Sequence, residues 1–272
     1  MGIVNVTPDS FSDGGLYLDP EAAIAHGRTL LAEGADILDV GGESTRPGAA
    51  EVPAGEEIER VVPVIGVLAA AGARVSVDTS KAEVAAAAID AGARIINDVT
   101  ALGDPEMASL CAEREVDVVL MHMRGTPRTM QEDPVYDDVV DDVRAFLAGR
   151  VELAMDAGVA EERIWVDPGI GFGKTVDHNL ELIRRLGELC ELGRPVLLGA
   201  SRKSFIGKLT GADVDHRVGG SIATALLGAQ AGASGLRVHD VAATRDALRL
   251  LDAVADSGWT GYGPWAGDEG KA

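Results

Sequence analysis

Positive side chains occur in three separated parts of the sequence. Arg46 lies in a loop-like, Gly-rich segment, Arg202 and Lys203 follow one apolar run, and Arg237 and His239 follow another. Because the chain has a net charge of −20, a group of cations at one rim predicts an anionic ligand such as a phosphate group. The alternative is that these cations pair with surface carboxylates.

A second set of polar residues follows other apolar runs. Asp78, Asn97 and Asp167 each come at the end of such a run. Two carboxylates and an amide can accept hydrogen bonds from the donor edge of a guanidine-like ring, and Lys203 can donate one to a ring carbonyl or nitrogen. The set predicts a site for a flat, polar heterocycle. Asp78 by itself could instead cap the helix that follows it.

Two further motifs have weaker meanings. The run from Gly169 to Lys174 is rich in glycine but lacks the spacing of a phosphate-binding Walker loop, so we expect a tight turn that lets backbone approach a ligand. His122 ends an apolar run and could form a pocket wall or belong to the core. His122 and His239 lack a Cys or Glu at ligand spacing, which argues against zinc.

Short apolar runs of strand length recur along the chain and precede these polar residues. Near-continuous hydrophobic runs are typical of strands buried on both faces of a parallel sheet. The predicted strands are Ile3–Val6, Ile37–Val40, Arg74–Val77, Ile95–Asn97, Val118–His122, Ile164–Val166, Pro195–Leu198 and Leu236–Val238.

Longer amphipathic segments separate the predicted strands. We expect helices near 20–33, 56–71, 81–91, 104–114, 138–157, 178–190, 218–231 and 241–255. A glycine follows many of them, as a left-handed helix cap favours. These glycines are Gly34, Gly72, Gly92, Gly158, Gly193 and Gly232.

Strict alternation of strand and helix predicts parallel strands with right-handed crossovers. Eight such units in 272 residues favour a single-domain α/β fold of the (β/α)8 TIM barrel type over an open doubly wound sheet, which usually has fewer units. We expect the barrel to span residues 1–258 and residues 259–272 to form a flexible tail. Residues just past the carboxyl ends of barrel strands line the active site, so the polar sets above should share one pocket.

Composition limits the partners and the location. The net charge of −20 argues against nucleic acid and an anionic membrane surface as partners. The sequence shows no signal peptide and no apolar stretch long enough to cross a bilayer. We therefore expect a cytoplasmic enzyme.

Seven motifs, in order and each at a predicted strand end, resemble dihydropteroate synthase, a family of pterin-binding barrels. The similarity covers nearly the whole chain, from Gly2 to about Leu251. The motifs are residues 2–15 (GIVNVTPDSFSDGG), 41–48 (GGESTRPG), 77–79 (VDT), 97–98 (ND), 167–169 (DPG), 201–204 (SRKS) and 237–240 (RVHD).

The resemblance implies a transferase of folate biosynthesis that condenses (7,8-dihydropterin-6-yl)methyl diphosphate with 4-aminobenzoate into 7,8-dihydropteroate and diphosphate. It implies a TIM barrel, Mg²⁺ as cofactor, a homodimer and sensitivity to sulfonamides. It also implies roles for individual residues. The pterin would be held by Asp78, Asn97, Asp167 and Lys203, the diphosphate by Arg46, Arg237 and His239, Mg²⁺ by Asn5, and the aminobenzoate by Phe11, Thr45, Pro47 and Ser204.

Among these residues, Asp78, Lys203, Arg237 and His239 are the expected catalytic groups. One departure from the family is that the chain begins at the first strand without the usual short leader, which would loosen the barrel bottom or reflect a trimmed start. Two rival functions share the pterin site: a methyltetrahydrofolate–corrinoid methyltransferase and a non-catalytic pterin-binding paralogue. Arg46 and the 201–204 motif argue against the methyltransferase, which has no use for a diphosphate clamp.

Overall fold

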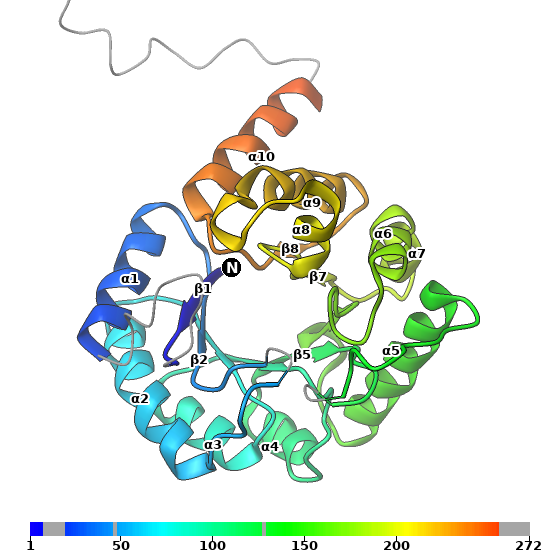
Figure 1. The fold of residues 1–272 in the computed structure, drawn as a ribbon. Helices are drawn as coiled ribbons and strands as arrows, with labels where there is room; N and C mark the ends of the chain where they lie inside the picture. Colours follow the sequence, from blue (N-terminus) through cyan, green and yellow to red (C-terminus); the bar gives the residue numbers. More distant parts are fainter. Residues whose placement is uncertain (8–19, 46–47, 127–128, 256–272) are drawn as a thin grey trace, which may run out of the picture.

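In a computed structural model, the eight strands of the described residues stand inside a ring of helices (Figure 1). The structure describes residues 1–7, 20–45, 48–126 and 129–255, so the predicted tail and most of the first loop lie outside it. The strands are β1 (Gly2–Asn5), β2 (Leu38–Gly41), β3 (Val75–Asp78), β4 (Ile95–Asp98), β5 (Asp117–Met121), β6 (Ile164–Asp167), β7 (Leu197–Leu198) and β8 (Gly235–Leu236).

All of the strand pairs are parallel and follow chain order. Strands β1 to β6 form one sheet and β7 pairs with β8. Two isolated parallel bridges join these two parts into a ring, Val166 with Val196 and Gly2 with Val238. The backbone N–H of Ile3 donates to the carbonyl of Val238 at 3.1 Å across the second seam. The predicted α/β TIM-barrel class is therefore confirmed, with β7 and β8 shorter than the apolar runs suggested.

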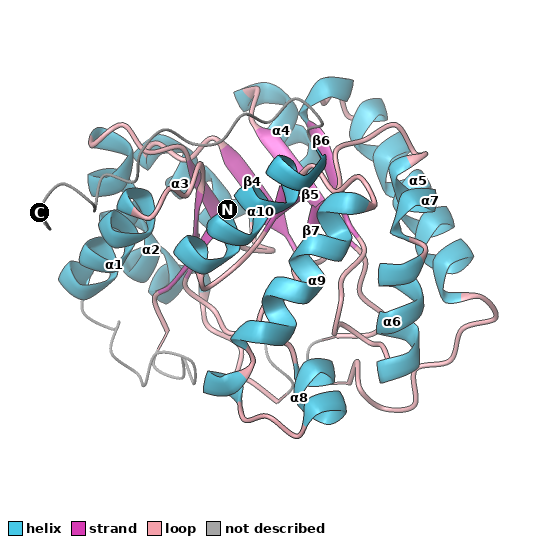
Figure 2. Cartoon of the chain, turned by 90° about the horizontal axis from the view of Figure 1, so that it is seen from above, coloured by secondary structure: helices cyan, strands magenta, loops and turns pink. Residues whose placement is uncertain are grey.

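Helices cover the outside of the strands, as Figure 2 shows. They are α1 (Pro20–Ala32), α2 (Ala54–Ala70), α3 (Ala82–Ala91), α4 (Met107–Arg114), α5 (Val139–Asp156), α6 (Val176–Arg184), α7 (Leu186–Cys190), α8 (Ser204–Thr210), α9 (Val218–Gln230) and α10 (Val241–Ala255), with short 3-10 turns at Glu161–Arg163 and Val214–His216. No helix among the described residues is long and apolar enough to cross a membrane.

The helix ends follow the local chemistry of the sequence. All six glycines expected to cap helices have positive φ, for example +117° at Gly92, where a Cβ would also approach Ala69 to 2.7 Å. At the other end of a helix, the Asp138 carboxylate caps α5 by accepting from the N–H groups of Val140 and Asp141. Helix ends are thus among the best-predicted features of the chain.

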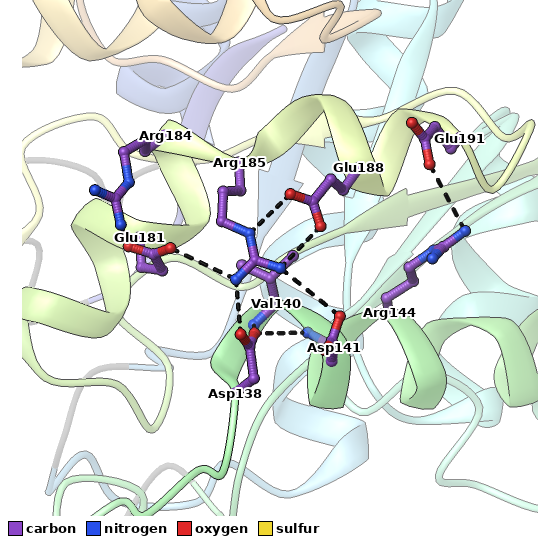
Figure 3. Close-up of polar contacts among 9 residues, drawn as sticks. All are labelled: Asp138, Val140, Asp141, Arg144, Glu181, Arg184, Arg185, Glu188 and Glu191. Atoms are coloured by element: carbon purple, nitrogen blue, oxygen red, sulfur yellow. Dashed lines mark hydrogen bonds and ion pairs between the residues drawn. The ribbon is translucent and has the colours of Figure 1, made fainter.

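The helix predicted over 178–190 is divided in two at Arg185, which is an outcome of tertiary contacts. The Arg185 guanidinium pairs with Glu188 through Nε and Oε1 at 2.8 Å and with Asp138 through Nη1 and Oδ2 at 2.7 Å (Figure 3). Asp138 lies at the start of α5, so this one side chain ties the α6–α7 junction to α5. Helix α8, which follows the 201–204 motif, was not predicted.

The core lies between the strands and the helices. Its largest fully buried side chains include Leu38, Ile65, Ile96, Leu120 and Ile164. A few buried side chains of strands β2 to β6 are polar. Asp39 and Ser76 are the second residues of β2 and β3, whereas Asn97, Asp98 and Asp167 lie at the carboxyl ends of β4 and β6. Buried charges are costly unless they are paired, so these acids need partners inside the barrel.

Candidate active site

A pocket of about 690 Å³ opens at the carboxyl ends of the strands. This is the end at which parallel barrels carry their active sites. The structure brings most of the described predicted site residues to the pocket wall. These residues are Asn5, Thr45, Asp78, Lys203, Ser204, Arg237 and His239.

Asp78 lies in a chain of charged groups inside the barrel. Arg237 donates from Nη2 to Asp78 Oδ2 at 2.7 Å and from Nε to Asp39 Oδ2 at 2.6 Å. The amide of Asn97 donates to the same oxygen of Asp39 at 3.1 Å. Predicted residues from β3, β4 and the end of β8 are thus joined through a residue of β2 that the sequence analysis did not select.

Asp39 could have been found from the sequence, because an acid inside the apolar run Ile37–Val40 needs a buried partner. Its side chain is fully buried, and its second oxygen, Oδ1, has no hydrogen-bond partner. One guanidinium therefore serves two carboxylates, and the group of Asp39, Asp78 and Arg237 carries a net negative charge when both acids are ionised.

Asp78 is an acid whose ionisation is finely balanced. Burial raises its pKa to about 7, against the attraction of Arg237, and the neighbouring charges of Asp39 and Glu57 push in the same direction as burial. An acid with a pKa near neutrality changes charge easily when a ligand brings hydrogen-bond donors. Asp78 is therefore suited to bind a ligand with a donor edge.

Asp167 ends β6 on the other side of the barrel and is 5% exposed. Its Oδ1 accepts from the N–H of Gly169 at 2.7 Å, and burial raises its pKa. Gly199 lies against the same carboxylate: a Cβ built on that glycine would be 3.5 Å from Asp167 Oδ2. The Asp167 carboxylate is thus held by backbone, in contrast to the Asp78 carboxylate, which is held by Arg237.

The glycine-rich segment after β6 is the tight turn that was expected. Gly169 has φ +68°, and a Cβ there would lie 1.8 Å from the carbonyl oxygen of His122. Gly173 has φ +63°, and its Cβ would lie 2.6 Å from the carbonyl oxygen of Arg124. Only glycine allows this segment to pack so closely against the loop that follows β5.

Lys174 is the last residue of this segment, and its side chain is buried. It is 3% exposed, and its Nζ lies 2.9 Å from His122 Nδ1 and donates to the carbonyl of Phe172 at 2.9 Å. Burial lowers the pKa of Lys174 to about 7 and that of His122 to about 3. His122, whose role was left open, is therefore a buried neutral partner of Lys174.

Lys203 and Phe172 meet inside the pocket. The ammonium group of Lys203 lies 3.9 Å from the centre of the Phe172 ring, a cation–π contact. The stem of Lys203 packs on Gly171, where a Cβ would be 3.2 Å from Cδ. Phe172 was not predicted as a site residue; its place in a turn that approaches the ligand was the only available signal.

The rim after β7 and β8 carries the predicted cations and two more. His239 Nδ1 lies 3.0 Å from Ser201 Oγ, and Arg202 forms two hydrogen bonds with Asp240, at 2.6 and 3.0 Å. Arg217 and Lys208 also line the pocket and were not predicted. Asp240 thus neutralises Arg202 within the fold. The other cations of the 201–204 and 237–240 motifs still lie around one opening.

Three predicted residues lie outside the described part of the chain. They are Phe11 in the first loop and Arg46 and Pro47 in the second. Their roles stay predictions. Arg237 was expected to bind the diphosphate together with the other cations. Its guanidinium instead forms hydrogen bonds with Asp39 and Asp78, so its role in binding phosphate also stays a prediction.

Asn5 is the predicted metal residue, and it lines the pocket at the end of β1. No group of three His, Cys, Asp or Glu side chains that could hold a metal ion occurs among the described residues. An amide oxygen is a ligand that suits Mg²⁺, which commonly keeps several waters and takes its other ligands from substrate phosphates. The donor set therefore fits a magnesium ion that arrives with a diphosphate.

Comparison with known proteins shows which family the chain resembles. A family model described as pterin binding enzyme matches residues 1–239. The dihydropteroate synthase of Escherichia coli strain K12 is 47% identical over 255 residues, which is 93% of this chain and 90% of the relative.

Solved structures give the same result. A dihydropteroate synthase of Xanthomonas albilineans with 4-aminobenzoic acid is 55% identical, with a TM-score of 0.88 and coverage of 94% of this chain and 92% of that one. A dihydropteroate synthase of Yersinia pestis in a sulfonamide drug complex is 45% identical, with a TM-score of 0.92 and coverage of 94% and 93%.

The fold and the pocket, with these likenesses, define a pterin-binding enzyme built on a (β/α)8 barrel. Within that class, the chain belongs to the dihydropteroate synthase family. The predictions of the family and of a transferase activity are thereby confirmed.

Proposed function

We propose that this protein condenses (7,8-dihydropterin-6-yl)methyl diphosphate with 4-aminobenzoate to form 7,8-dihydropteroate and diphosphate. One observation carries the proposal: a single pocket joins the acid Asp78 to the cationic rim around His239. The acid matches the donor edge of a pterin and the rim matches its diphosphate. Neither rival function needs both the acid and the cationic rim. A methyltransferase that uses methyltetrahydrofolate, for example, has no diphosphate to release.

The pterin is held by hydrogen bonds from two sides. Ionised Asp78 accepts from the amino and ring N–H groups, and Asp167 lies across the barrel as a second acceptor. Lys203 donates to the ring carbonyl or nitrogen while its ammonium group stays on the Phe172 ring. Asn97 acts through Asp39, whose carboxylate holds Arg237 beside Asp78.

The first chemical change is cleavage of the bond between the exocyclic methylene carbon and the diphosphate oxygen, whose electron pair leaves with diphosphate. His239, oriented by Ser201, and the neighbouring cations Arg217 and Lys208 stabilise the growing negative charge. Arg46 and Arg237 are the further predicted cations. Mg²⁺, when bound with Asn5 and the diphosphate, supplies additional charge neutralisation.

Loss of diphosphate leaves positive charge on the methylene carbon and the pterin ring, near the carboxylates of Asp78 and Asp167. The neutral amine of 4-aminobenzoate then forms the new C–N bond, and its extra proton passes to diphosphate or water. No strong general base is needed. Water must be kept out, since it would trap the same cation. We propose that the residues after β1 and β2 do this around the aminobenzoate, with Phe11, Thr45, Pro47 and Ser204 as its contacts.

The first test is diphosphate release with the dihydropterin diphosphate and Mg²⁺, measured with and without 4-aminobenzoate. We expect release that depends on both 4-aminobenzoate and Mg²⁺, with dihydropteroate formed in equal amount. Pterin binding without any release would favour the non-catalytic paralogue, and methyl transfer from methyltetrahydrofolate to a corrinoid protein would favour the methyltransferase. Because the Yersinia relative was solved with a sulfonamide drug, we also propose that sulfonamides compete with 4-aminobenzoate here.

We further propose a homodimer that forms through the outer faces of α9 and α10. Leu227 on α9 is 54% exposed, and Leu250 and Val254 on α10 are 68% and 77% exposed. Large apolar side chains exposed together favour a protein interface. Sedimentation velocity should show a dimer that Leu250→Glu converts into a monomer; a monomeric wild-type protein would overturn the proposal. A cytoplasmic location stays a prediction.

A further inference from the structure

A charged cluster beside the pocket lies outside the mechanism above. Lys81, the residue before α3, reaches two acids that come from different elements. Its ammonium group pairs with Glu43 of the loop between β2 and α2, and with Glu57 Oε2 of α2 at 2.6 Å. We call the described residues of this loop, 42–45 and 48–53, loop 2. Burial lowers the pKa of Lys81, but the hydrogen bonds that its ammonium group donates to Glu43 and Glu57 outweigh burial and raise the pKa, so the amine is charged at neutral pH.

Glu43 closes loop 2 with its own side chain. Its Oε1 accepts from the backbone N–H of Val52 at 3.0 Å, while Oε2 meets Lys81. Ser44 and Thr45, which follow Glu43 directly, line the pocket. The placement of these two pocket-lining residues is therefore tied, through one carboxylate, to the amine at the start of α3.

Glu57 gives the cluster a second link to the pocket. It is fully buried, and its Oε1 has no hydrogen-bond partner. Its negative charge is also among the causes that raise the pKa of Asp78. Without Lys81, this buried carboxylate would lack its counter-charge. Lys81 therefore holds two elements beside the pocket: the loop after β2 through Glu43, and α2 through Glu57.

We propose that Lys81 is a positioning residue of the active site, which holds loop 2 through Glu43 in the shape that binds 4-aminobenzoate. This inference rests on the proposed function and adds a residue to it. A purely structural brace is the competing explanation. Loss of a brace would lower the amount of folded, active enzyme and so reduce turnover without regard to the substrate. Loss of a positioning residue would instead raise the KM of the substrate that loop 2 contacts most.

The test compares Lys81→Met with Lys81→Arg, which keeps the charge, and with Arg114→Met. Arg114 of α4 pairs with Asp90 of α3, the helix that Lys81 precedes, at 2.8 Å. It is the control because it removes an ion pair to α3 that is exposed and has no link to loop 2. Thermal melting first establishes that each variant is folded. Glu43→Gln, which keeps an acceptor for Val52, serves as the milder change if Lys81→Met fails to fold.

We expect Lys81→Met to raise the KM for 4-aminobenzoate at least about tenfold, a loss comparable to that of one charge-assisted hydrogen bond. The KM for the pterin diphosphate should change by less than about threefold, and Lys81→Arg should recover most of the loss. Hydrogen exchange read by mass spectrometry should show faster exchange at the Val52 amide in Lys81→Met only. Equal changes in both KM values, or an effect in Arg114→Met of the same size, would overturn the proposal.

The proposed function and the positioning role of Lys81 can fail separately. If wild-type protein releases no diphosphate, the proposed function fails, and the hydrogen-exchange comparison still decides whether Lys81 holds loop 2. If wild-type protein is active and the folded Lys81→Met variant keeps both its KM values and its Val52 exchange rate, the function stands and Lys81 has no positioning role.

Discussion

At the scale of single residues, the site depends on how buried charges are shared. Arg237 serves Asp39 and Asp78 together, and Asn97 supports Asp39. The sequence indicated Asp78, Asn97 and Arg237 because each follows a strand, where barrels place functional side chains. It could not show that Arg237 turns inward to Asp78, since side-chain direction depends on which partners the closed ring brings near.

Pterin binding should depend on pH through Asp78. Burial raises its pKa to about 7, and only the ionised form accepts two donors of the ring. Binding of the unphosphorylated 6-hydroxymethyl-dihydropterin, which removes titration of the diphosphate, should therefore strengthen as pH rises from about 6 to about 8. Calorimetry can measure this. Asp78→Asn should bind at least about thirtyfold more weakly with a flat profile; a wild-type profile that is also flat would contradict this role.

Lys174 should make the stability of the fold depend on pH. Its pKa is lowered from 10.5 to about 7 by burial, so between these values the unfolded chain binds the proton and the folded chain does not. The free energy of unfolding should therefore rise as pH increases from about 7 towards about 10. Lys174→Met removes this term, so the wild type should gain on the order of 2–4 kcal/mol relative to the variant over that range.

Urea unfolding at several pH values measures this difference, and other titrating groups cancel between the two proteins. A constant difference would mean that Lys174 stays charged when folded. The sequence showed Lys174 only as the last residue of a glycine-rich turn. Its burial against His122 and Phe172 follows from the approach of two loops, which residue spacing does not reveal.

At the scale of elements, the order of strands and helices was well predicted and the irregular parts were not. Near-continuous apolar runs indicated all eight strands, and glycines marked helix ends. Helix α8 and the break at Arg185 were missed because neither has a local signal: α8 follows the cationic motif, and the break depends on Asp138 of α5. Loop positions such as Phe172 and Arg217 were missed for the same reason.

The turn after β6 should tolerate no side chain at Gly169. A Cβ there would lie 1.8 Å from the carbonyl oxygen of His122, at φ +68°. Gly169→Ala should lower the free energy of unfolding by about 3 kcal/mol or more and weaken pterin binding, because Asp167 loses its backbone partner. Gly193 has nearly the same φ, +69°, with nothing within 4 Å of its Cβ.

Gly193→Ala is therefore the matched control, and it should cost only about 1 kcal/mol, the effect of the backbone conformation alone. Urea unfolding of the two variants separates the clash from the strain. Equal losses in both would show that the loop after β5 moves aside, and that the close approach at Gly169 is not required.

At the scale of the whole molecule, the negative net charge disfavours the folded state and the approach of an anionic substrate. The net charge of −20 repels itself in the compact state, and the cations at the rim of the pocket act locally against it. Raising NaCl from about 0.01 M to about 0.15 M shortens the Debye length from about 30 Å to about 8 Å. The urea midpoint should therefore rise with salt. A midpoint that falls would show that local ion pairs such as Arg202–Asp240 dominate over the net charge.

The two junctions that close the ring, Val166 with Val196 and Gly2 with Val238, have a consequence for protein engineering. The chain up to Leu192 contains β1 to β6 with Asp78 and Asp167, and the remainder contains β7, β8 and the rim residues Lys203 and His239. Gly193 between them is exposed, and a Cβ built on it would have nothing within 4 Å. A gene divided at this glycine would yield two fragments, each carrying part of the site. Folate synthesis in a cell would then report whether two fused proteins bring the fragments together.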